Sequence, residues 1–265
     1  MSLHRSNEEA VREEFKKQAK GFSDKRLTLN NRTLLEWILK GLGIHSCMEV
    51  LDVAAGTGIL SRAVAPGVKR VVSIDISEDM IEEGMRQNQA AGLPNIEYRL
   101  ANGERILYGN DTFDLVISRL AFHHFAHPAD VLREMSRVST FAGEVCVVDM
   151  ISPEDDMLCR LYNHYEMLRD PSHTYALKES ELISLFCEAD LFVLSVETME
   201  VPVYVDRWLE LARTDGLTAA QIIKDIEREL LTGQPVTGLF PFIDQGETMF
   251  KQKWMKMVGK KQQRM

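Results

Sequence analysis

The sequence has few of the features that mark secreted, membrane-spanning or metal-binding proteins. Its four cysteines are too far apart for a disulfide framework or a pair of metal ligands, so we expect free thiols at Cys47, Cys146, Cys159 and Cys187. No apolar run approaches the roughly 18 residues that a membrane span needs. The polar N-terminus lacks the apolar core of a secretion signal. We therefore predict a cytoplasmic protein without a metal site or stable membrane association.

Proline and glycine do not gather into a linker either. The 8 prolines and 16 glycines are spread thinly along the 265 residues, and we find neither a repeat nor a low-complexity tract. With 45% hydrophobic and 27% charged residues, the chain holds enough apolar material for a sizeable core. We predict a single domain over residues 1–265.

Positive charge is scarce in the body of the chain. The net charge is −9, although residues 251–265 carry six Lys and Arg and no Asp or Glu. An acidic body disfavours contact with phosphate backbones, so we predict a small-molecule partner and no nucleic acid. The basic end overlaps a segment of alternating polarity, which predicts a solvated strand edge and tail.

Short β-rich segments alternate with helical ones, after two helices that begin the chain. This alternation predicts an α/β fold, with a doubly wound, mostly parallel seven-stranded sheet, helices on both faces and an antiparallel last strand. Ser77, followed by Glu78 and Asp79, predicts the N-cap of one helix. We expect helical substrate-side insertions at residues 151–178 and 202–245, and strands at 48–53, 70–74, 96–100, 113–118, 144–149, 191–200 and 248–258.

Small and acidic residues follow the first two predicted strands, where ligands bind in such sheets. Gly56 and Gly58 allow the backbone to approach a nucleoside, and Asp75 suits a carboxylate that accepts ribose hydroxyls. A Gly-x-Gly alone is common in tight turns, and an Asp after a strand is often a helix cap. Because the two follow the first and second strands in register, together they indicate a nucleoside-binding site more strongly than either does alone. A dinucleotide fingerprint would have a third glycine where Ser61 stands, which weakens the alternative of a nucleotide-dependent oxidoreductase.

Three motifs together resemble the class I S-adenosylmethionine-dependent methyltransferases, from about Met48 to Asp149. They are the glycine loop at 51–58, the acidic strand end at 73–80, and Ala-Asn-Gly-Glu at 101–104, followed by the strand at 111–119. The last motif usually reads Gly-Asp-Ala-Glu in this family. Further segments, at 118–125 and 162–173, are similar to a bacterial branch of ubiquinone/menaquinone type (methyltransferase type 11). The resemblance implies the Rossmann-like methyltransferase fold and S-adenosylmethionine, with S-adenosylhomocysteine as its product.

The resemblance also assigns a role to residues of the three motifs. Gly56 and Gly58 would approach the methionine portion and ribose, Asp75 would hold the ribose hydroxyls, and Asn102 would accept from the adenine amino group. Asparagine in place of aspartate keeps an acceptor oxygen but removes the charge, so this contact is weaker or re-aimed. The cofactor-binding set is Asp52, Ala54, Gly56, Thr57, Gly58, Asp75, Ile76, Met80, Asn102, Gly103, Glu104, Ser118 and Arg119.

Histidines mark the predicted acceptor side. His123 and His124 follow the fourth strand, and an imidazole that titrates near neutrality suits proton removal, with His124 preferred. The alternative is that one is a hydrogen bonder at the strand end and the other packs against a neighbouring phenylalanine. His173, oriented by Asp170, and Arg169, which would hold an anionic oxygen, complete the catalytic candidates; a structural Arg–Asp pair is the alternative there.

Two apolar segments are predicted to border the site. The N-terminal helical part, residues 1–45 with Phe15, Gln18, Ala19 and Phe22, lies where related enzymes close over the cofactor, which predicts a lid; ordinary packing is the alternative. Residues 239–243 either line an acceptor pocket with Trp208 or anchor the insertion.

The predicted function is methyl transfer from S-adenosylmethionine to carbon or oxygen of a small molecule, by in-line displacement. The alternatives are an oxidoreductase and a non-catalytic S-adenosylmethionine-binding protein. A homodimer is also expected.

Overall fold

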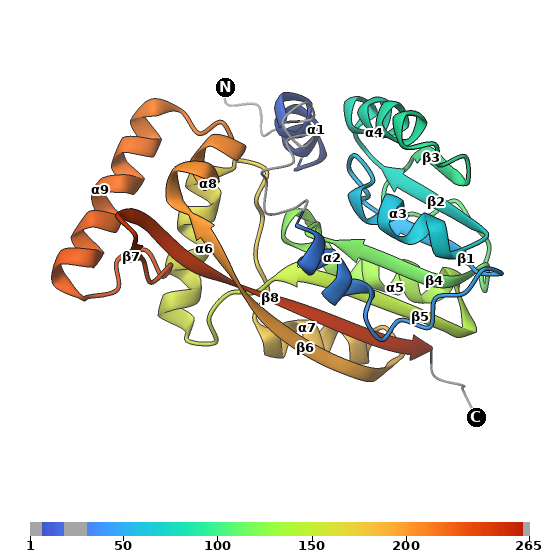
Figure 1. Cartoon of the computed structure of the whole chain (residues 1–265). Coiled ribbons are helices and arrows are strands. Elements are labelled where there is room, and N and C mark those ends of the chain that lie inside the picture. The colour runs from blue at the N-terminus through green and yellow to red at the C-terminus, as the bar shows by residue number, and fades with distance from the viewer. Residues whose placement is uncertain (1–6, 19–30, 262–265) are drawn as a thin grey trace, which may run out of the picture.

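A central sheet organises the molecule (Figure 1). The computed structural model describes residues 7–18 and 31–261, and within them the strand order is β3-β2-β1-β4-β5-β8-β6, with β7 paired to β8. Pairs among β1 to β5 are parallel, and β8 is antiparallel to both β5 and β6. The predicted doubly wound, mostly parallel fold is confirmed, with one small strand in addition. The strands are β1 (Glu49–Val53), β2 (Arg70–Asp75), β3 (Ile96–Leu100), β4 (Phe113–Arg119), β5 (Ser139–Met150), β6 (Leu191–Tyr204), β7 (Phe242–Asp244) and β8 (Glu247–Lys261).

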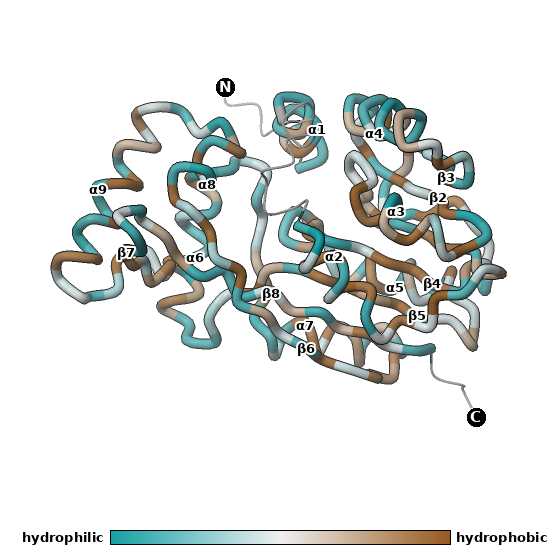
Figure 2. The backbone as a smooth tube through the Cα atoms, in the orientation of Figure 1, coloured by the Kyte–Doolittle hydropathy of each residue, from teal (hydrophilic) through white to brown (hydrophobic). Residues whose placement is uncertain are grey.

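Helices cover both faces of this sheet, and each face has its own apolar core. Successive strand residues point to opposite faces, so Val50 joins one core and Leu51 the other. Figure 2 shows hydrophobic positions concentrated along β4 and β5, with hydrophilic ones along α4. The helices are α1 (Asn7–Gln18), α2 (Arg32–Leu39), α3 (Ile59–Val64), α4 (Glu78–Ala91), α5 (Pro128–Val138), α6 (Asp156–Arg169), α7 (Glu179–Glu188), α8 (Val205–Leu211) and α9 (Gly216–Thr232), with a 3-10 turn η4 (Phe122–His124).

Local sequence signals determine where α4 begins. Ser77 is its N-cap, as predicted, and the Ser77 hydroxyl accepts a hydrogen bond from the Met80 amide. Glu78 and Asp79 occupy the first turn, where carboxylates interact favourably with the helix dipole. The helix is therefore fixed next to the end of β2, which carries Asp75.

The basic C-terminal strand is not a sheet edge. β8 lies between β5 and β6, so the prediction of a solvated edge is wrong, and residues 262–265 of the expected tail lie outside the described residues. Lys256 is only 1% exposed, and its ammonium donates to the carbonyls of Trp37 and Lys40 at the end of α2. It also pairs with Glu197 of β6. A lysine is stable there because carbonyls at the C-terminal end of a helix attract a cation.

The prediction of a helical insertion over 202–245 is wrong at its two ends. β6 extends to Tyr204 and includes Pro202, which is tolerated because β6 is an edge strand. At the other end β7 forms a hairpin with β8, and the two residues between them, Gln245 and Gly246, both have positive φ. Such a turn matches the twist of the strands that it joins.

Two further expectations concern membrane spans and cysteines. Among the helices of the described ranges, none is both long enough and apolar enough to cross a membrane. Cys146 and Cys159 are buried, Cys47 and Cys187 are exposed, and all four are free thiols.

Candidate active site

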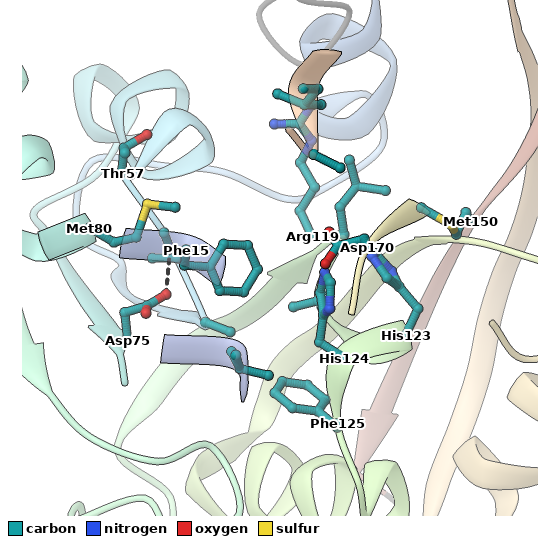
Figure 3. A pocket seen from close by; sticks show the side chains of 18 of the residues that line it. Phe15, Thr57, Asp75, Met80, Arg119, His123, His124, Phe125, Met150 and Asp170 are labelled. Atoms are coloured by element: carbon teal, nitrogen blue, oxygen red, sulfur yellow. Dashed lines mark hydrogen bonds between the residues drawn. The ribbon is translucent and has the colours of Figure 1, made fainter. Parts of the chain in front are cut away.

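One cavity of about 670 Å³ lies at the carboxyl ends of the parallel strands. Its two parts are the glycine-loop end, which contains Gly56, Asp75 and Asn102, and the histidine end, which contains His123, His124 and Trp208. Figure 3 shows Asp75 and Met80 on one side and the two histidines on the other, with Phe15 of α1 between them. A ligand that fills the cavity therefore contacts both parts.

The backbone of the glycine loop adopts conformations that favour glycine. Gly56 and Gly58 have positive φ, and Gly58 is the N-cap of α3. A Cβ at Gly58 would lie 1.9 Å from the Tyr98 hydroxyl, whereas one at Gly56 would meet nothing within 4 Å. Gly58 thus serves the packing of the loop, and Gly56 borders the open cavity.

Asp75 links the loop to the end of β2. Its carboxylate accepts from the Gly56 amide at 2.7 Å and from the Ser77 amide at 2.9 Å. Burial raises the pKa of Asp75, which is 7% exposed and lines the cavity. Each carboxylate oxygen retains a further lone pair, so the group suits a ligand with neighbouring hydroxyls.

Ser61, which replaces the third glycine of a dinucleotide fingerprint, has a structural task. Its hydroxyl donates to Asp52 at 2.5 Å and contacts the Ser73 hydroxyl at 2.7 Å. Burial raises the pKa of Asp52 to about 7, although Ser61 and Arg119 oppose this shift. Burial also lowers the pKa of Arg119 to about 10. A buried acid therefore lies behind the glycine loop.

The side chain of Asn102, which was expected to contact adenine, forms hydrogen bonds within the protein. Its side-chain oxygen accepts from the Glu104 amide at 2.8 Å, and its amide nitrogen donates to Glu8 of α1 at 2.6 Å. Gly103 packs closely, because a Cβ there would lie 3.1 Å from a methyl of Val53. The side-chain amide of Asn102 is therefore already hydrogen-bonded to the first turn of α1.

Most of the predicted cofactor residues line the cavity. Gly58 and Ser118 do not, and the Ser118 hydroxyl instead donates to the carbonyl of Val53, which ties β4 to β1. The residues that line it are Asp52, Ala54, Gly56, Thr57, Asp75, Ile76, Met80, Asn102, Gly103, Glu104 and Arg119.

His123 forms a buried pair with Asp149, the penultimate residue of β5. Nδ1 of the ring lies 2.6 Å from Oδ1 of Asp149, and each side chain is 4% exposed. The carboxylate also accepts from the backbone amides of Phe122 and Met150, at 2.6 and 2.7 Å. Because the carboxylate accepts from these amides, it also acts as the acceptor towards the ring, so in the neutral imidazole Nδ1 carries the proton and Nε2 the lone pair.

His124 lies in a different environment. Its Nδ1 is 2.9 Å from the carbonyl of Ser172 and therefore donates to it. Burial and the neighbouring His123 lower the pKa of His124 to about 4. The ring meets Phe15 edge to face, with centroids 5.0 Å apart. His124 is thus neutral near pH 7 and partly covered by α1.

His173 does not line the cavity, and Asn163 rather than Asp170 orients it. Nε2 of His173 lies 2.8 Å from Oδ1 of Asn163, and burial lowers the pKa of His173 to about 2. Asp170 accepts from the Ser172 amide and hydroxyl. Burial opposes ionisation of Asp170, but His124, Arg169 and Ser172 hold its pKa below the ordinary value.

Arg169 lines the cavity as a partner of two carboxylates. Its guanidinium lies 3.2 Å from Glu166 and 3.6 Å from Asp170, and 5.2 Å from the Trp208 ring centroid. The structural Arg–Asp pair, which was the alternative expectation, is therefore present.

The two apolar segments that were predicted to border the site differ in their position. Trp208 lines the cavity, whereas residues 239–243 do not, and Leu239 packs in the core shared with α6 and α9. Val11 and Phe15 of α1 also line it. The side chain of Gln18, and Ala19 and Phe22, lie outside the described residues.

The sequence and the structure are both similar to those of known methyltransferases. Residues 51–147 match the family described as a methyltransferase domain. The uncharacterized methyltransferase YcgJ of Bacillus subtilis (strain 168) is 29% identical over 79% of this chain and 82% of its own length. Its crystal structure has a TM-score of 0.80 at 26% identity, covering 88% of this chain and all of that chain. YafE of Escherichia coli (strain K12) is 31% identical over 57% of this chain and 72% of its own length. The chain belongs to the S-adenosylmethionine-dependent methyltransferase family.

Two features of this methyltransferase could not be read from its motifs. Asp149 was predicted only as the last residue of a strand, yet its position at a carboxyl edge, where ligands bind, was a usable signal. Asn163 lies within a predicted helix and has no local signal, because its contact with His173 depends on how the chain returns after α6. Within the described residues, no set of three or more His, Cys, Asp or Glu is arranged to hold a metal.

Proposed function

We propose that this methyltransferase binds S-adenosylmethionine at the glycine-loop end and methylates carbon or oxygen of a small molecule held at the histidine end. The main support for this proposal is that Asp75 and His123 line the same cavity, so a cofactor at one end and an acceptor at the other would lie next to each other. Alignment of two bound reactants can contribute about 7–11 kcal/mol to lowering a barrier.

The residues of the glycine-loop end fit the cofactor. Gly56 leaves open space where a side chain would project, and the Asp75 carboxylate lies beside it. In the proposed arrangement Asp75 holds the ribose hydroxyls, Ile76 and Met80 pack on the adenine, and Asn102 lies at its edge. When bound, S-adenosylmethionine supplies an electrophilic methyl group on a sulfonium and leaves as a neutral thioether.

The acceptor proposal is supported by a relative as well as by the cavity. The ubiquinone/menaquinone biosynthesis C-methyltransferase UbiE of Hydrogenovibrio crunogenus is 32% identical over 46% of this chain, and this chain matches 50% of its length. Aromatic residues, including Tyr204, Trp208 and Trp254, line the histidine end. Phenolic and quinol-like compounds are therefore the first acceptors to screen. Action in the cytoplasm, as a homodimer and without nucleic acid, belongs to the same proposal, as does a lid formed by residues 1–45.

Calorimetric titration with S-adenosylhomocysteine tests the cofactor site. Asp75→Ala should weaken binding about 10- to 100-fold, since a hydrogen bond to a charged group contributes about 1.5–3 kcal/mol. Asp79→Ala is the matched control, because Asp79 precedes Met80 on α4 but does not line the cavity. A folded wild type that binds neither S-adenosylhomocysteine nor S-adenosylmethionine, or that prefers NAD, would contradict the proposal.

A further inference from the structure

The histidine end contains a buried, hydrogen-bonded pair, His123 and Asp149, that does not belong to the predicted cofactor-binding set. Asp149 holds Nδ1 of His123 at 2.6 Å, and the ring of His123 lines the cavity. Nε2, on the other side of the ring, takes part in no hydrogen bond with the described residues, and it carries the lone pair. A base in this orientation is ready to receive a proton from a bound molecule.

His123 is better placed for this task than His124. A proton on His123 would be balanced by the directly bonded Asp149, whereas Nδ1 of His124 faces only the carbonyl and hydroxyl of Ser172. The charged and titratable groups around the two rings are Asp149 on β5, Arg169 at the end of α6, and Asp170 and His173 in the segment that follows. Of these, only Asp149 touches the His123 ring through a hydrogen bond.

Much of the remaining wall of the histidine end is apolar and aromatic, which suits a ring. An aromatic ring gains contact area against such side chains and keeps a hydroxyl at one edge. The apolar and aromatic residues that line this end are Leu120, Met150, Val203, Tyr204, Trp208, Leu211 and Trp254.

We propose that the histidine end takes a ring acceptor with a hydroxyl group, and that Asp149 positions His123 to remove the proton of that hydroxyl. The inference rests on the proposed function, which supplies the methyl group. The proton passes from the hydroxyl oxygen to Nε2, and Asp149 stays ionised beside the imidazolium. The electron pair left on the acceptor, shared between the oxygen and the ring carbons ortho and para to it, forms the new bond to the methyl carbon. The pair of the broken sulfur–carbon bond stays on sulfur. After attack through carbon, the ring hydrogen moves to the oxygen, so either product releases one proton per turnover.

Nitrogen-15 NMR of the histidine rings tests the positioning role on the full chain bound to S-adenosylhomocysteine. Wild-type His123, assigned by comparison with His123→Asn, should be protonated at Nδ1 and unprotonated at Nε2. In Asp149→Asn the amide nitrogen should face the ring, because the other position meets two backbone amides, those of Phe122 and His123, whereas this position meets only the amide of Met150; the ring then becomes protonated at Nε2. Asp170→Asn removes the same charge nearby but should leave this tautomer unchanged.

A wild-type ring protonated at Nε2 would overturn the positioning role without any variant, so a misfolded Asp149→Asn does not leave the question open. An unchanged tautomer in folded Asp149→Asn would also overturn it. Equal responses to Asp149→Asn and Asp170→Asn would do the same, because they would indicate a general effect of charge.

Calorimetry with phenol and anisole, on protein saturated with S-adenosylhomocysteine, tests the acceptor class. Phenol should bind a few-fold more tightly than anisole, since only phenol can donate a hydrogen bond to Nε2 of His123. Equal or tighter binding of anisole, or binding of neither ring, would overturn the acceptor class. Failure of S-adenosylhomocysteine to bind at all would contradict the proposed function, and it is measured separately.

Discussion

The two ends of the cavity are built in different ways. The glycine-loop end comes from short loops that directly follow β1, β2 and β3, and backbone conformation and backbone amides shape much of it. The histidine end depends on side chains from η4, β5, α6, α8 and β8, which are far apart in sequence. Local motifs specify the first end, whereas packing of distant elements specifies the second. Glycine substitutions at the first end should therefore act through the backbone, whereas substitutions at the second end should act through charge and hydrogen bonding.

The largest expected effect separates two glycines of the same loop. Gly58→Ala should lower the free energy of unfolding by about 2–4 kcal/mol, because the new Cβ collides with Tyr98 at a positive φ. Gly56→Ala should cost only about 1–2 kcal/mol of stability, since its Cβ enters open space, but should weaken S-adenosylhomocysteine binding at least about tenfold. Chemical denaturation and calorimetry measure the two quantities. If both variants lost the same stability, the division of roles between these glycines would be wrong.

A smaller effect should distinguish the two ends by pH. Asp52 has a raised pKa of about 7, so its buried carboxyl destabilises the folded state increasingly as pH rises from about 4 to 7. Asp52→Asn should therefore gain stability relative to wild type over that range, on the order of 2 kcal/mol. His124 has a lowered pKa of about 4, so its burial destabilises the folded state as pH falls from about 6.5 to 4. His124→Asn should therefore become more stable relative to wild type as pH falls from about 6.5 to 4.

Urea denaturation of the three proteins at several pH values between 4 and 8 checks these opposite slopes. Parallel curves for wild type and Asp52→Asn would show that Asp52 is ionised without penalty. Parallel curves for wild type and His124→Asn would show that the His124 ring is protonated in the folded state without penalty.

The smallest expected effect concerns α1, which touches both ends. Glu8 accepts from Asn102, and the side chain of Asn7 donates to the carbonyl of His124 at 2.9 Å. A ligand that fills the cavity should add contacts to Phe15 and reduce opening of this helix, so S-adenosylhomocysteine should slow tryptic cleavage after Lys16 and Lys17 a few-fold. Cleavage at an exposed site elsewhere, such as after Lys224 on α9, is the internal control. Unchanged cleavage of α1 would count against a lid.

The sequence predicted the fold well because its signals are local. Alternating strands and helices, the Ser77 cap and the glycine loop each depend on neighbouring residues, and they lie where expected. The hairpin at Gln245 and Gly246 was missed because its turn lacks the common Asn-Gly or Asp-Gly pair. The interior position of β8 was missed because its lysines suggested solvent, while the acceptors for Lys256 are carbonyls of a helix more than 200 residues earlier.

The site was predictable only in part, because some of its contacts depend on local motifs and others on residues far apart in the sequence. Eleven of the thirteen expected cofactor residues line the cavity, because motif and position coincide at strand ends. The position of Asp149 at a strand end could have been noted, but the residue that each histidine contacts was not predictable. Asp149 meets His123 across the ends of two strands, and Asn163 meets His173 across a turn. No spacing rule in the sequence distinguishes these contacts from ordinary surface pairs.

The hydroxyl of Ser61 has a consequence for which nucleotides the loop admits. By holding Asp52 beneath the first turn of α3, it places an acidic group where dinucleotide-binding proteins present only glycine backbone and a helix terminus to a pyrophosphate. Asp52 interacts electrostatically with Arg119, so this turn presents an acid–base pair to a ligand rather than backbone amides alone. The Ser61 hydroxyl thereby removes the anion-binding character of a turn made only of glycine, which favours a nucleoside without a diphosphate.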